Sequence, residues 1–282
     1  ISGVPTGAIF DSGVKNADGS WTFSQADMAR LHLLPGAGYT GTMNLVVTAT
    51  ATEISTGASA STTQNMSIEI SATTSTYTTS TEAAQTLTGT TANDLIRGYA
   101  GNDTINAGDG NDMLYGGSGN DTINGGNGND WLYGGVGGDT INGGAGNDML
   151  QGGVGDDTLT GSTGADTFRW ELADRGTTTT PASDTITDFD LTANSDKLDL
   201  RDLLQGDLHA GTDTGNLGSF LHFELSGADT IVKVSTTGGF ASGYNAGAVD
   251  QQIILTDVNL TSIGTDQQII QNLLTNGKLI AD

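Results

Sequence analysis

The stretch GGSGNDTINGGNGND, residues 116–130, repeats a glycine-rich unit that is nine residues long. Each unit carries one aspartate, and an apolar residue follows it by two positions, as Ile123 follows Asp121. The aspartates in this unbroken register are Asp94, Asp103, Asp112, Asp121, Asp130, Asp139, Asp148, Asp157 and Asp166. The apolar residues are Ile96, Ile105, Leu114, Ile123, Leu132, Ile141, Leu150, Leu159 and Phe168. A repeat this regular predicts a solenoid of short strands and turns.

The two parts of the unit have different conformational requirements. The three residues around the apolar position form a very short strand, whose middle side chain points inward. The six glycine-rich residues form a turn with backbone angles that only glycine adopts at low cost. Such a turn exposes carbonyl oxygens that no nearby N–H group satisfies, and a hard divalent cation is a natural partner for them.

Two units make one coil, so each turn stacks on the turn that lies two units further along the sequence. Stacked strands lie about 4.8 Å apart, which allows one ion to bridge two successive turns. The carboxylate pairs expected to share an ion are Asp94/Asp112, Asp103/Asp121, Asp112/Asp130, Asp121/Asp139, Asp130/Asp148, Asp139/Asp157 and Asp148/Asp166. We therefore expect about seven Ca²⁺ ions, with backbone carbonyls of the turns completing about six oxygen ligands for each ion.

This solenoid, a β-roll, is not expected to stay folded without the metal. Each short strand buries one side chain, whereas ordering the glycine turns carries a high entropic cost. Residues 94–168 also hold eleven Asp against one Arg, so charge repulsion opposes folding. Calcium binding therefore supplies folding free energy, and the folded fraction is expected to follow the ambient calcium concentration.

The two faces of the roll differ, because the true period is two units rather than one. One face carries apolar and aromatic residues at its outward positions: Met113, Tyr115, Trp131, Tyr133 and Met149. Cover by the C-terminal segment or the linker is one interpretation of this stripe, and a docking surface for a partner or glycan is the other. The opposite face carries a Thr and Asn ladder that fits a solvated strand surface. Ice binding is not expected, because the turns lack an ordered row of threonines.

Composition excludes several classes of partner. The net charge is −24, and 28 Asp stand against 5 Glu, a bias toward turns and hard-cation sites rather than acidic helices. With 9 Lys and Arg in 282 residues, nucleic acid and anionic membranes are poor partners. No apolar run approaches the roughly 20 residues of a membrane span. The chain has no Cys and does not begin with Met, and we expect it to be a fragment of a longer protein.

The composition divides the chain into four segments of an all-β-dominated protein. Residues 1–72 alternate like strands and predict part of a β-sandwich. Residues 73–86 form a Thr/Ser-rich linker, and residues 87–168 form the right-handed parallel β-roll. Leu87 keeps the inward phase nine residues before Ile96, but Gln85 replaces Asp, so this half-turn is expected to carry no full metal site. Residues 169–282 predict a β-rich cap with short helices.

With these motifs the chain resembles the C-terminal region of RTX adhesins exported by type I secretion systems, and more narrowly the very large Lap-type biofilm adhesins. The GGxGxDxUx nonapeptides match the RTX calcium-binding β-roll residue by residue. Residues 1–72 resemble the Ig-like modules of these adhesins, which implies an Ig-like β-sandwich that lacks its opening strands. Residues 169–282 resemble their C-terminal secretion domains. The resemblance implies an uncleaved export signal near the C-terminal end of the chain, which a type I transporter reads. Asp184, Asp188, Asp190, Asp196 and Asp199 are either ligands of an extra ion in the cap or ordinary turn and cap residues.

Motifs for catalysis are absent from the sequence. It contains no H-E-x-x-H zinc motif and no G-x-S-x-G elbow, and without Cys it has no thiol nucleophile. Of the histidines, His32 and His222 lie in strand-like runs, where a structural role is expected. We therefore expect no enzyme activity, no catalytic residue and no organic cofactor.

Together with this resemblance, the sequence predicts a secreted, monomeric module at the bacterial cell surface that folds on calcium. The module is expected to serve export at the C-terminal end of a large adhesin, which acts in cell adhesion and biofilm formation. One alternative is a ligand-binding tip that uses the aromatic stripe to bind a host, biofilm or glycan surface. Another alternative is the tail of a secreted RTX enzyme or toxin.

Overall fold

The computed structural model describes residues 1–4, 9–10, 14–16, 18–22, 33–34, 41–52, 59–70, 83–192, 195–204, 206 and 211–281. The chain divides into two compact units, Ile1–Ser75 and Thr76–Asp282, and each is described by itself. Among the described residues, no helix is both long and apolar enough to cross a membrane.

The first unit consists of paired antiparallel strands. Its strands are β1 (Ile9–Phe10), β2 (Val14–Lys15), β3 (Trp21–Thr22), β4 (Leu33–Leu34), β5 (Gly41–Thr52) and β6 (Ser59–Ile70). The pairs are β1 with β4, β2 with β3, and β5 with β6 in a long hairpin. Leu45 and Trp21 are buried. The sandwich expected over residues 1–72 stays a prediction, because much of this segment, and most of residues 73–86, lies outside the described residues.

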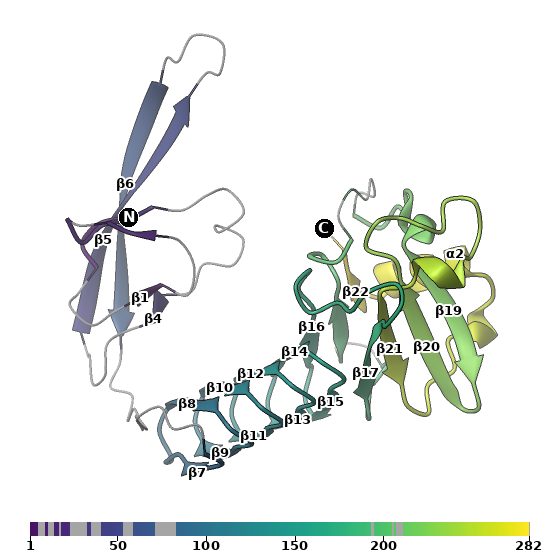
Figure 1. Cartoon of the computed structure of the whole chain (residues 1–282), viewed down its shortest axis with the longest axis horizontal. Helices are drawn as coiled ribbons and strands as arrows, with labels where there is room; N and C mark the ends of the chain where they lie inside the picture. Colours follow the sequence, from purple (N-terminus) through teal and green to yellow (C-terminus); the bar gives the residue numbers. More distant parts are fainter. Residues whose placement is uncertain are drawn as a thin grey trace. The chain divides into compact units, whose positions relative to one another are not determined.

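The second unit begins with a parallel β-solenoid of about five turns (Figure 1). Its strands are β7 (Thr86–Thr88), β8 (Leu95–Ala100), β9 (Thr104–Asp109), β10 (Met113–Ser118), β11 (Thr122–Asn127), β12 (Trp131–Val136), β13 (Thr140–Ala145), β14 (Met149–Val154), β15 (Thr158–Thr163) and β16 (Thr167–Arg169). Each strand pairs in parallel with the strand two places along, as Leu114 pairs with Leu132. The coil of two units and the all-β architecture expected from the sequence are confirmed.

One column of side chains fills the interior of the roll. The apolar residue of every repeat, from Ile96 to Phe168, is fully buried, and Leu87 extends the column at its N-terminal end. Since only about one large side chain per strand is buried, the apolar core of the roll is thin. The roll therefore needs a further source of stability in its turns.

The cap continues both sheets of the roll. Its elements are β17 (Ala182–Ile186), β18 (Lys197–Asp199), η1 (Leu217–Ser219), β19 (Leu221–Ser226), β20 (Asp229–Val234), η2 (Ala246–Ala248), β21 (Gln251–Leu255), η3 (Thr261–Ile263), α2 (Asp266–Thr275) and β22 (Leu279–Ile280). One sheet runs β8-β10-β12-β14-β16-β18-β22, and the other runs from β7 through β15 to β17, β21, β20 and β19. Helix α2 buries Ile269, Ile270, Leu273 and Leu274 and begins with a capping box of Thr265 and Gln268. A single hydrophobic core joins Leu87 to Ala281.

Candidate metal centre

The glycine-rich turns reverse the chain through residues with positive φ. Gly126 and Gly128 have φ of 112° and 126°, a region that other residues rarely adopt. Space imposes the same choice, because a Cβ on Gly126 would lie 2.0 Å from the carbonyl oxygen of Gly108 in the preceding coil. Stacked turns therefore require glycine both for their conformation and for their close approach.

The repeat aspartates form two columns, one along each edge of the roll. The main-chain N–H of each of the first seven aspartates, Asp94 to Asp148, donates to Oδ1 of the aspartate in the next coil, 18 positions later, at 2.7–2.8 Å. All seven carboxylate pairs expected from the sequence are joined in this way. Their role as calcium ligands stays a prediction, but the structure brings each pair together.

The second oxygen of each repeat aspartate has no hydrogen-bond partner. Asp94 is unpartnered at Oδ1, and the other eight aspartates are unpartnered at Oδ2. All nine are buried, with 1–3% of their surface exposed. A buried carboxylate oxygen without a donor is costly. The missing partner is therefore a group that the polypeptide does not supply.

Unpartnered carboxylate oxygens and carbonyl oxygens of the neighbouring coil lie close to the same glycines. A Cβ built on Gly98 would lie 2.4 Å from Asp103 Oδ2 and 2.5 Å from the carbonyl oxygen of Gly116. The same convergence occurs at Gly125, where Asp130 Oδ2 and the carbonyl oxygen of Gly143 are 2.4 Å and 2.5 Å away. Carboxylate and carbonyl oxygens without nitrogen or sulfur donors are the ligands of a hard cation, so these residues fit Ca²⁺.

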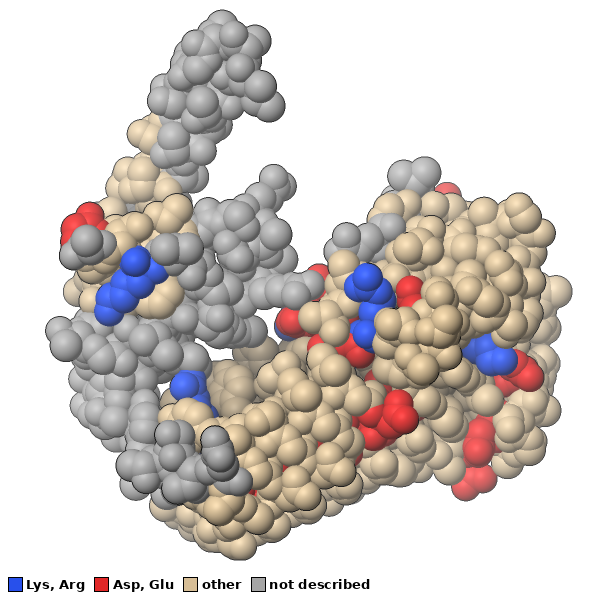
Figure 2. Space-filling model, in the orientation of Figure 1, with Lys and Arg blue, Asp and Glu red and all other residues tan. Residues whose placement is uncertain are grey.

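Burial raises the pKa of the column carboxyl groups from Asp112 to Asp166. The pKa is raised to about 7 at Asp139, Asp148 and Asp157 and to about 6 at Asp112 and Asp166. The negative charges of neighbouring carboxylates raise the pKa further, whereas the backbone N–H hydrogen bonds lower it. A divalent cation beside these groups would offset both burial and repulsion. All nine repeat aspartates are buried, and most of the face of the roll visible in Figure 2 is neither acidic nor basic.

A second ladder, which we did not predict from the sequence, runs beside each aspartate column. The asparagine before the aspartate accepts, at Oδ1, the N–H of the residue 18 positions later, as Asn111 does from Asn129 at 2.7 Å. The same bond joins Asn120 to Gly138 and Asn147 to Ala165. The signal in the sequence was the recurring Asn-Asp pair, and its effect is to fix the spacing of successive turns.

Both aspartate columns continue into the cap at longer sequence spacings. The N–H of Asp157 donates to Asp184 Oδ1 at 2.9 Å, and the N–H of Asp166 donates to Asp196 Oδ1 at 3.0 Å. At the other end, the N–H of Gln85 donates to Asp103 Oδ1 at 2.7 Å, so the half-turn at Gln85 contributes its backbone but no carboxylate.

Two of the cap aspartates predicted as extra ligands have several protein donors. Asp184 Oδ2 accepts hydrogen bonds from Trp170 Nε1 at 2.6 Å and from Gln251 Nε2 at 2.8 Å. Burial raises the pKa of Asp184 to about 7, while these donors lower it. Asp188 accepts the N–H groups of Gly161 and Ser162 at 3.0 Å and 2.7 Å.

The other three candidates are also hydrogen bonded. Asp190 accepts the N–H and hydroxyl of Thr192, Asp199 pairs with Arg201 at 2.6 Å, and Asp196 Oδ2 accepts the N–H of Asp190 at 2.8 Å. Within the described part of the chain, no group of three or more His, Asp or Glu side chains is placed to hold a metal. An extra ion in the cap therefore stays a prediction to which these contacts add no support.

Three residues of the aromatic stripe, Met113, Trp131 and Met149, line an open groove on the roll. Met113, Trp131 and Met149 are aligned on neighbouring strands and half-buried. The groove has a volume of about 410 Å³ and is also lined by Asn111, Asn129, Asn147, Asp112, Asp130, Asp148, Ala165 and Thr167. Tyr115 and Tyr133 stack edge to face at 6.2 Å, and the Arg97 guanidinium lies 5.2 Å from the Tyr115 ring.

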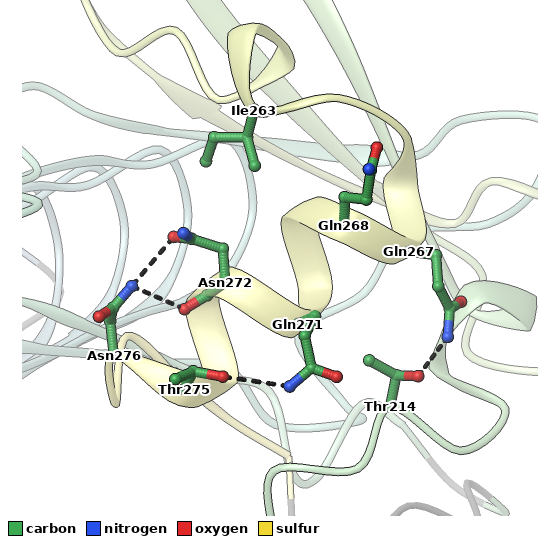
Figure 3. A pocket seen from close by; sticks show the side chains of 8 residues that line it. All are labelled: Thr214, Ile263, Gln267, Gln268, Gln271, Asn272, Thr275 and Asn276. Atoms are coloured by element: carbon green, nitrogen blue, oxygen red, sulfur yellow. Dashed lines mark hydrogen bonds between the residues drawn. The ribbon is translucent and has the colours of Figure 1, made fainter.

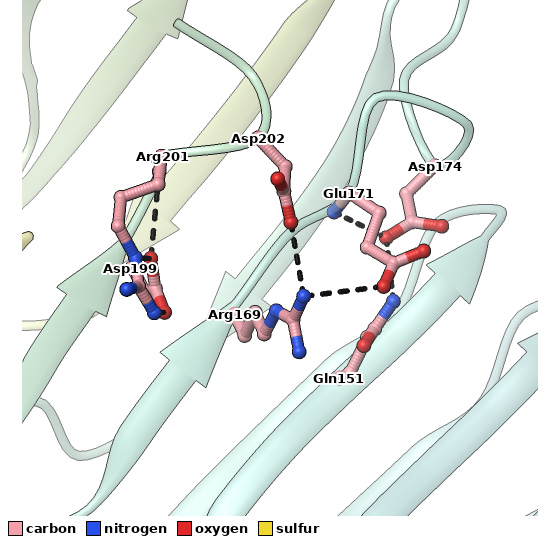
Figure 4. A network of polar contacts seen from close by, with 7 residues as sticks. All are labelled: Gln151, Arg169, Glu171, Asp174, Asp199, Arg201 and Asp202. Atoms are coloured by element: carbon pink, nitrogen blue, oxygen red, sulfur yellow. Dashed lines mark hydrogen bonds and ion pairs between the residues drawn. The ribbon is translucent and has the colours of Figure 1, made fainter. Parts of the chain in front are cut away.

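Part of the cap covers the C-terminal end of this face (Figure 4). Gln151 is buried and donates through Nε2 to Asp174 Oδ2 at 3.0 Å. Arg169 links Glu171 at 3.3 Å to Asp202 at 2.9 Å. Burial raises the pKa of Tyr133 to about 12, and the charges of Asp174 and Glu171 contribute. The stripe is thus covered at one end and forms a groove over the preceding coils.

A second hollow lies beside helix α2 and has a volume of about 590 Å³. Figure 3 shows its lining, which consists of Thr214, Ile263, Gln267, Gln268, Gln271, Asn272, Thr275 and Asn276. These groups can donate and accept hydrogen bonds, but none is a nucleophile activated by a base.

The histidines provide one polar contact in the described residues. His222 Nδ1 lies 2.7 Å from Asp266 Oδ2, and its ring stacks on Tyr244 at 3.9 Å. This arrangement ties β19 to the start of α2, in agreement with a structural role. His32 and His209 lie outside the described residues.

Comparison with known proteins identifies the repeats. Residues 79–168 match the RTX calcium-binding nonapeptide repeat in four copies, at residues 79–114, 106–141, 115–150 and 133–168. The roll therefore consists of RTX repeats, a type of repeat that binds calcium. The search of curated proteins gives no match.

Solved structures with similarity to the chain include two parts of one enzyme and a lipase. The AlgE6R3 subunit of the Azotobacter vinelandii mannuronan C5-epimerase is 21% identical, with 72% of this chain and 80% of that chain covered and a TM-score of 0.30. The AlgE6R2 subunit of the same enzyme is 24% identical, with 69% and 91% covered and a TM-score of 0.30. Extracellular lipase LipA from Serratia marcescens is 17% identical, with 66% and 38% covered and a TM-score of 0.28.

Proposed function

We propose that the chain is a non-catalytic, monomeric, extracellular module that folds on calcium and serves secretion and folding at the C-terminal end of a large bacterial surface adhesin. The observation that carries this proposal is the pair of aspartate columns, in which nine buried carboxylates each have one oxygen without a protein partner. These columns lie in RTX calcium-binding repeats, which occur in secreted proteins.

Bound calcium would supply the positive charge that offsets the buried carboxylates. The residues of the chain form the turns and provide the oxygen ligands. The glycines open the turns, the aspartates supply carboxylate oxygens, and the turn carbonyls complete the ligand set. With the thin core of the roll, this makes ion binding the main source of folding free energy. The chain would stay unfolded in a calcium-poor cytoplasm and fold where calcium is abundant outside the cell.

The proposed partner in export is a type I secretion transporter that reads the C-terminal segment. The test is export of the full chain from cells carrying such a system, compared with a chain that lacks residues 225–282. The full chain should reach the medium. There it should resist protease only when calcium is present. Export of the shortened chain at the same rate would contradict the assignment of the signal to this segment.

A second candidate function is binding of a glycan or receptor in the groove of the aromatic stripe, which supports adhesion or biofilm contact. The favouring observation is that Met113, Trp131 and Met149 line the groove together with three regularly spaced asparagines. Aromatic and amide groups together suit an uncharged sugar. Trp131→Ala should abolish adhesion without changing calcium-dependent folding. Thr140→Ala, on the opposite sheet, should leave both adhesion and calcium-dependent folding unchanged. Unchanged adhesion in Trp131→Ala would remove this candidate.

A further inference from the structure

The aspartate column that ends at Asp196 is followed by a buried lysine. Lys278 is 2% exposed and, among the described residues, is the only Lys or Arg that is buried. It directly precedes β22, the strand that pairs with β18 as the next rung of the sheet. A buried ammonium group is costly unless negative charge or hydrogen bonds compensate it.

The backbone of Lys278 is fixed on both sides. Its N–H donates to the carbonyl oxygen of Leu273 at 2.8 Å, and its own carbonyl oxygen accepts the N–H of Leu198 at 2.8 Å. From this position the side chain reaches the turn that joins β17 to β18. The position of Lys278 at the start of β22 therefore places the ammonium beside the turn that precedes Asp196.

The surroundings of the ammonium are oxygens. Nζ donates to Ser195 Oγ at 2.5 Å and lies 3.4 Å from the carbonyl oxygen of Asp190. Burial lowers the pKa of Lys278, whereas the negative charges of Asp196 and Asp190 raise it and the positive charge of Lys197 lowers it. A hydroxyl oxygen and a backbone carbonyl oxygen are ligands that a hard cation also takes.

The other column ends at Asp184, where uncharged side chains rather than a lysine lie beside the carboxylate. There, Asp184 Oδ2 accepts neutral donors from Trp170 and Gln251 at the position where the roll aspartates have no partner. Asp196 Oδ2 accepts the N–H of Asp190, with the lysine beside this turn. In both columns, the carboxylate that follows the last repeat is satisfied by the protein.

We propose that Lys278 is a built-in cation that closes one calcium column, with its ammonium in place of the next metal ion. This inference rests on the proposed calcium binding by the roll. It makes the last rung of this column independent of calcium, and it sets the C-terminal limit of the ions in that column.

The test compares the number of calcium ions bound per chain, by equilibrium dialysis, in the wild type, Lys278→Ala, Lys278→Arg and Lys197→Met. Lys278→Ala should bind one more ion than the wild type, because removal of the ammonium leaves an open set of oxygens. Lys278→Arg keeps the charge, and Lys197→Met removes an exposed lysine from the paired strand, so both should bind the wild-type number. If Lys278→Ala does not fold in calcium, Lys278→Met, which keeps the aliphatic stem, is measured instead.

The outcomes separate this inference from the proposed function. An unchanged ion count in the Lys278 variant, with normal calcium binding by the wild type, would overturn the inference alone, even if the variant is less stable. A wild-type chain that binds no calcium would contradict the proposed function, and the inference would fall with it.

Discussion

A single aspartate in the middle of a column acts on two coils. Asp130 accepts the N–H of Asp112 with Oδ1, and its Oδ2 lies where the Gly143 carbonyl oxygen converges. Asp130→Asn keeps the shape and the Oδ1 acceptor but removes the charge. We expect the calcium midpoint of folding, followed by circular dichroism, to rise roughly tenfold or more.

The matched control is Asp109→Asn. Asp109 is an exposed turn residue outside the columns, where its Oδ1 accepts Asn127 Nδ2 at 2.7 Å. Its midpoint should stay close to that of the wild type. Equal shifts in the two variants would show that the column carboxylates have no special role in calcium binding.

A glycine in the stacked turns is constrained by conformation and by space. Gly126→Ala requires a positive φ and places a Cβ 2.0 Å from a backbone oxygen, so the variant should fail to form the roll even in saturating calcium. Gly227→Ala also requires a positive φ, of 68°, but its Cβ meets nothing within 4 Å. That control should fold with a loss of about 1 kcal/mol. Thermal unfolding in calcium measures both, and similar losses would rule out close stacking as the cause.

Because the pKa values of the column carboxyl groups are raised, the stability of the metal-free fold and the affinity for calcium should depend on pH in opposite directions. Burial raises the pKa of Asp139, Asp148 and Asp157 in the metal-free fold from 3.8 to about 7. Between these pH values the folded chain binds more protons than the unfolded chain, so the stability of the metal-free fold falls as pH rises from about 4 to about 7. Residual structure in EGTA should therefore be greater at pH 5 than at pH 8.

Calcium binding should show the reverse dependence. Protons compete with the ion for the same carboxylates, so the calcium midpoint should be higher at pH 6 than at pH 8. Calcium titrations at both pH values, followed by circular dichroism, test this expectation. A midpoint that does not change with pH would contradict the assignment of buried carboxylates as ligands.

At the level of the elements, the sequence was sufficient for the roll and insufficient for its C-terminal end. The nonapeptide fixes the strand, the turn and the inward residue locally, so a period of two units predicts which strands pair. Beyond Phe168 the chain leaves the coil. By counting, Asp184 lies two units after Asp166, yet the structure stacks it on Asp157. Such stacking depends on how residues 170–181 return to the sheet, which no local pattern encodes.

The sequence could not decide whether another segment covers the aromatic stripe. The stripe is visible in the repeats, but Asp174, which accepts a hydrogen bond from Gln151 at its end, lies in a segment without periodicity. Exposure of an outward side chain depends on contacts between distant segments, so the sequence left both interpretations open. The structure supports cover at Gln151 and an open groove at Trp131.

At the level of the whole second unit, roll and cap form one compact body. Two sheets run through both parts, and the hydrophobic core is continuous from Leu87 to Ala281. Solenoids are stabilised by contacts between neighbouring coils and by closed ends. The cap closes the C-terminal end with a mixed sheet and helix α2, so the ions in the roll should bind and stabilise the unit cooperatively.

The central claim is that this fold depends on calcium. The most direct test is far-UV circular dichroism of the full chain during a Ca²⁺ titration, with reversal by EGTA and with Mg²⁺ as the control ion. We predict a cooperative gain of β-structure in calcium, its loss in EGTA, and no comparable gain in Mg²⁺, which demands a tighter octahedral site. A roll that is already folded in EGTA, with a spectrum that calcium does not change, would contradict this claim.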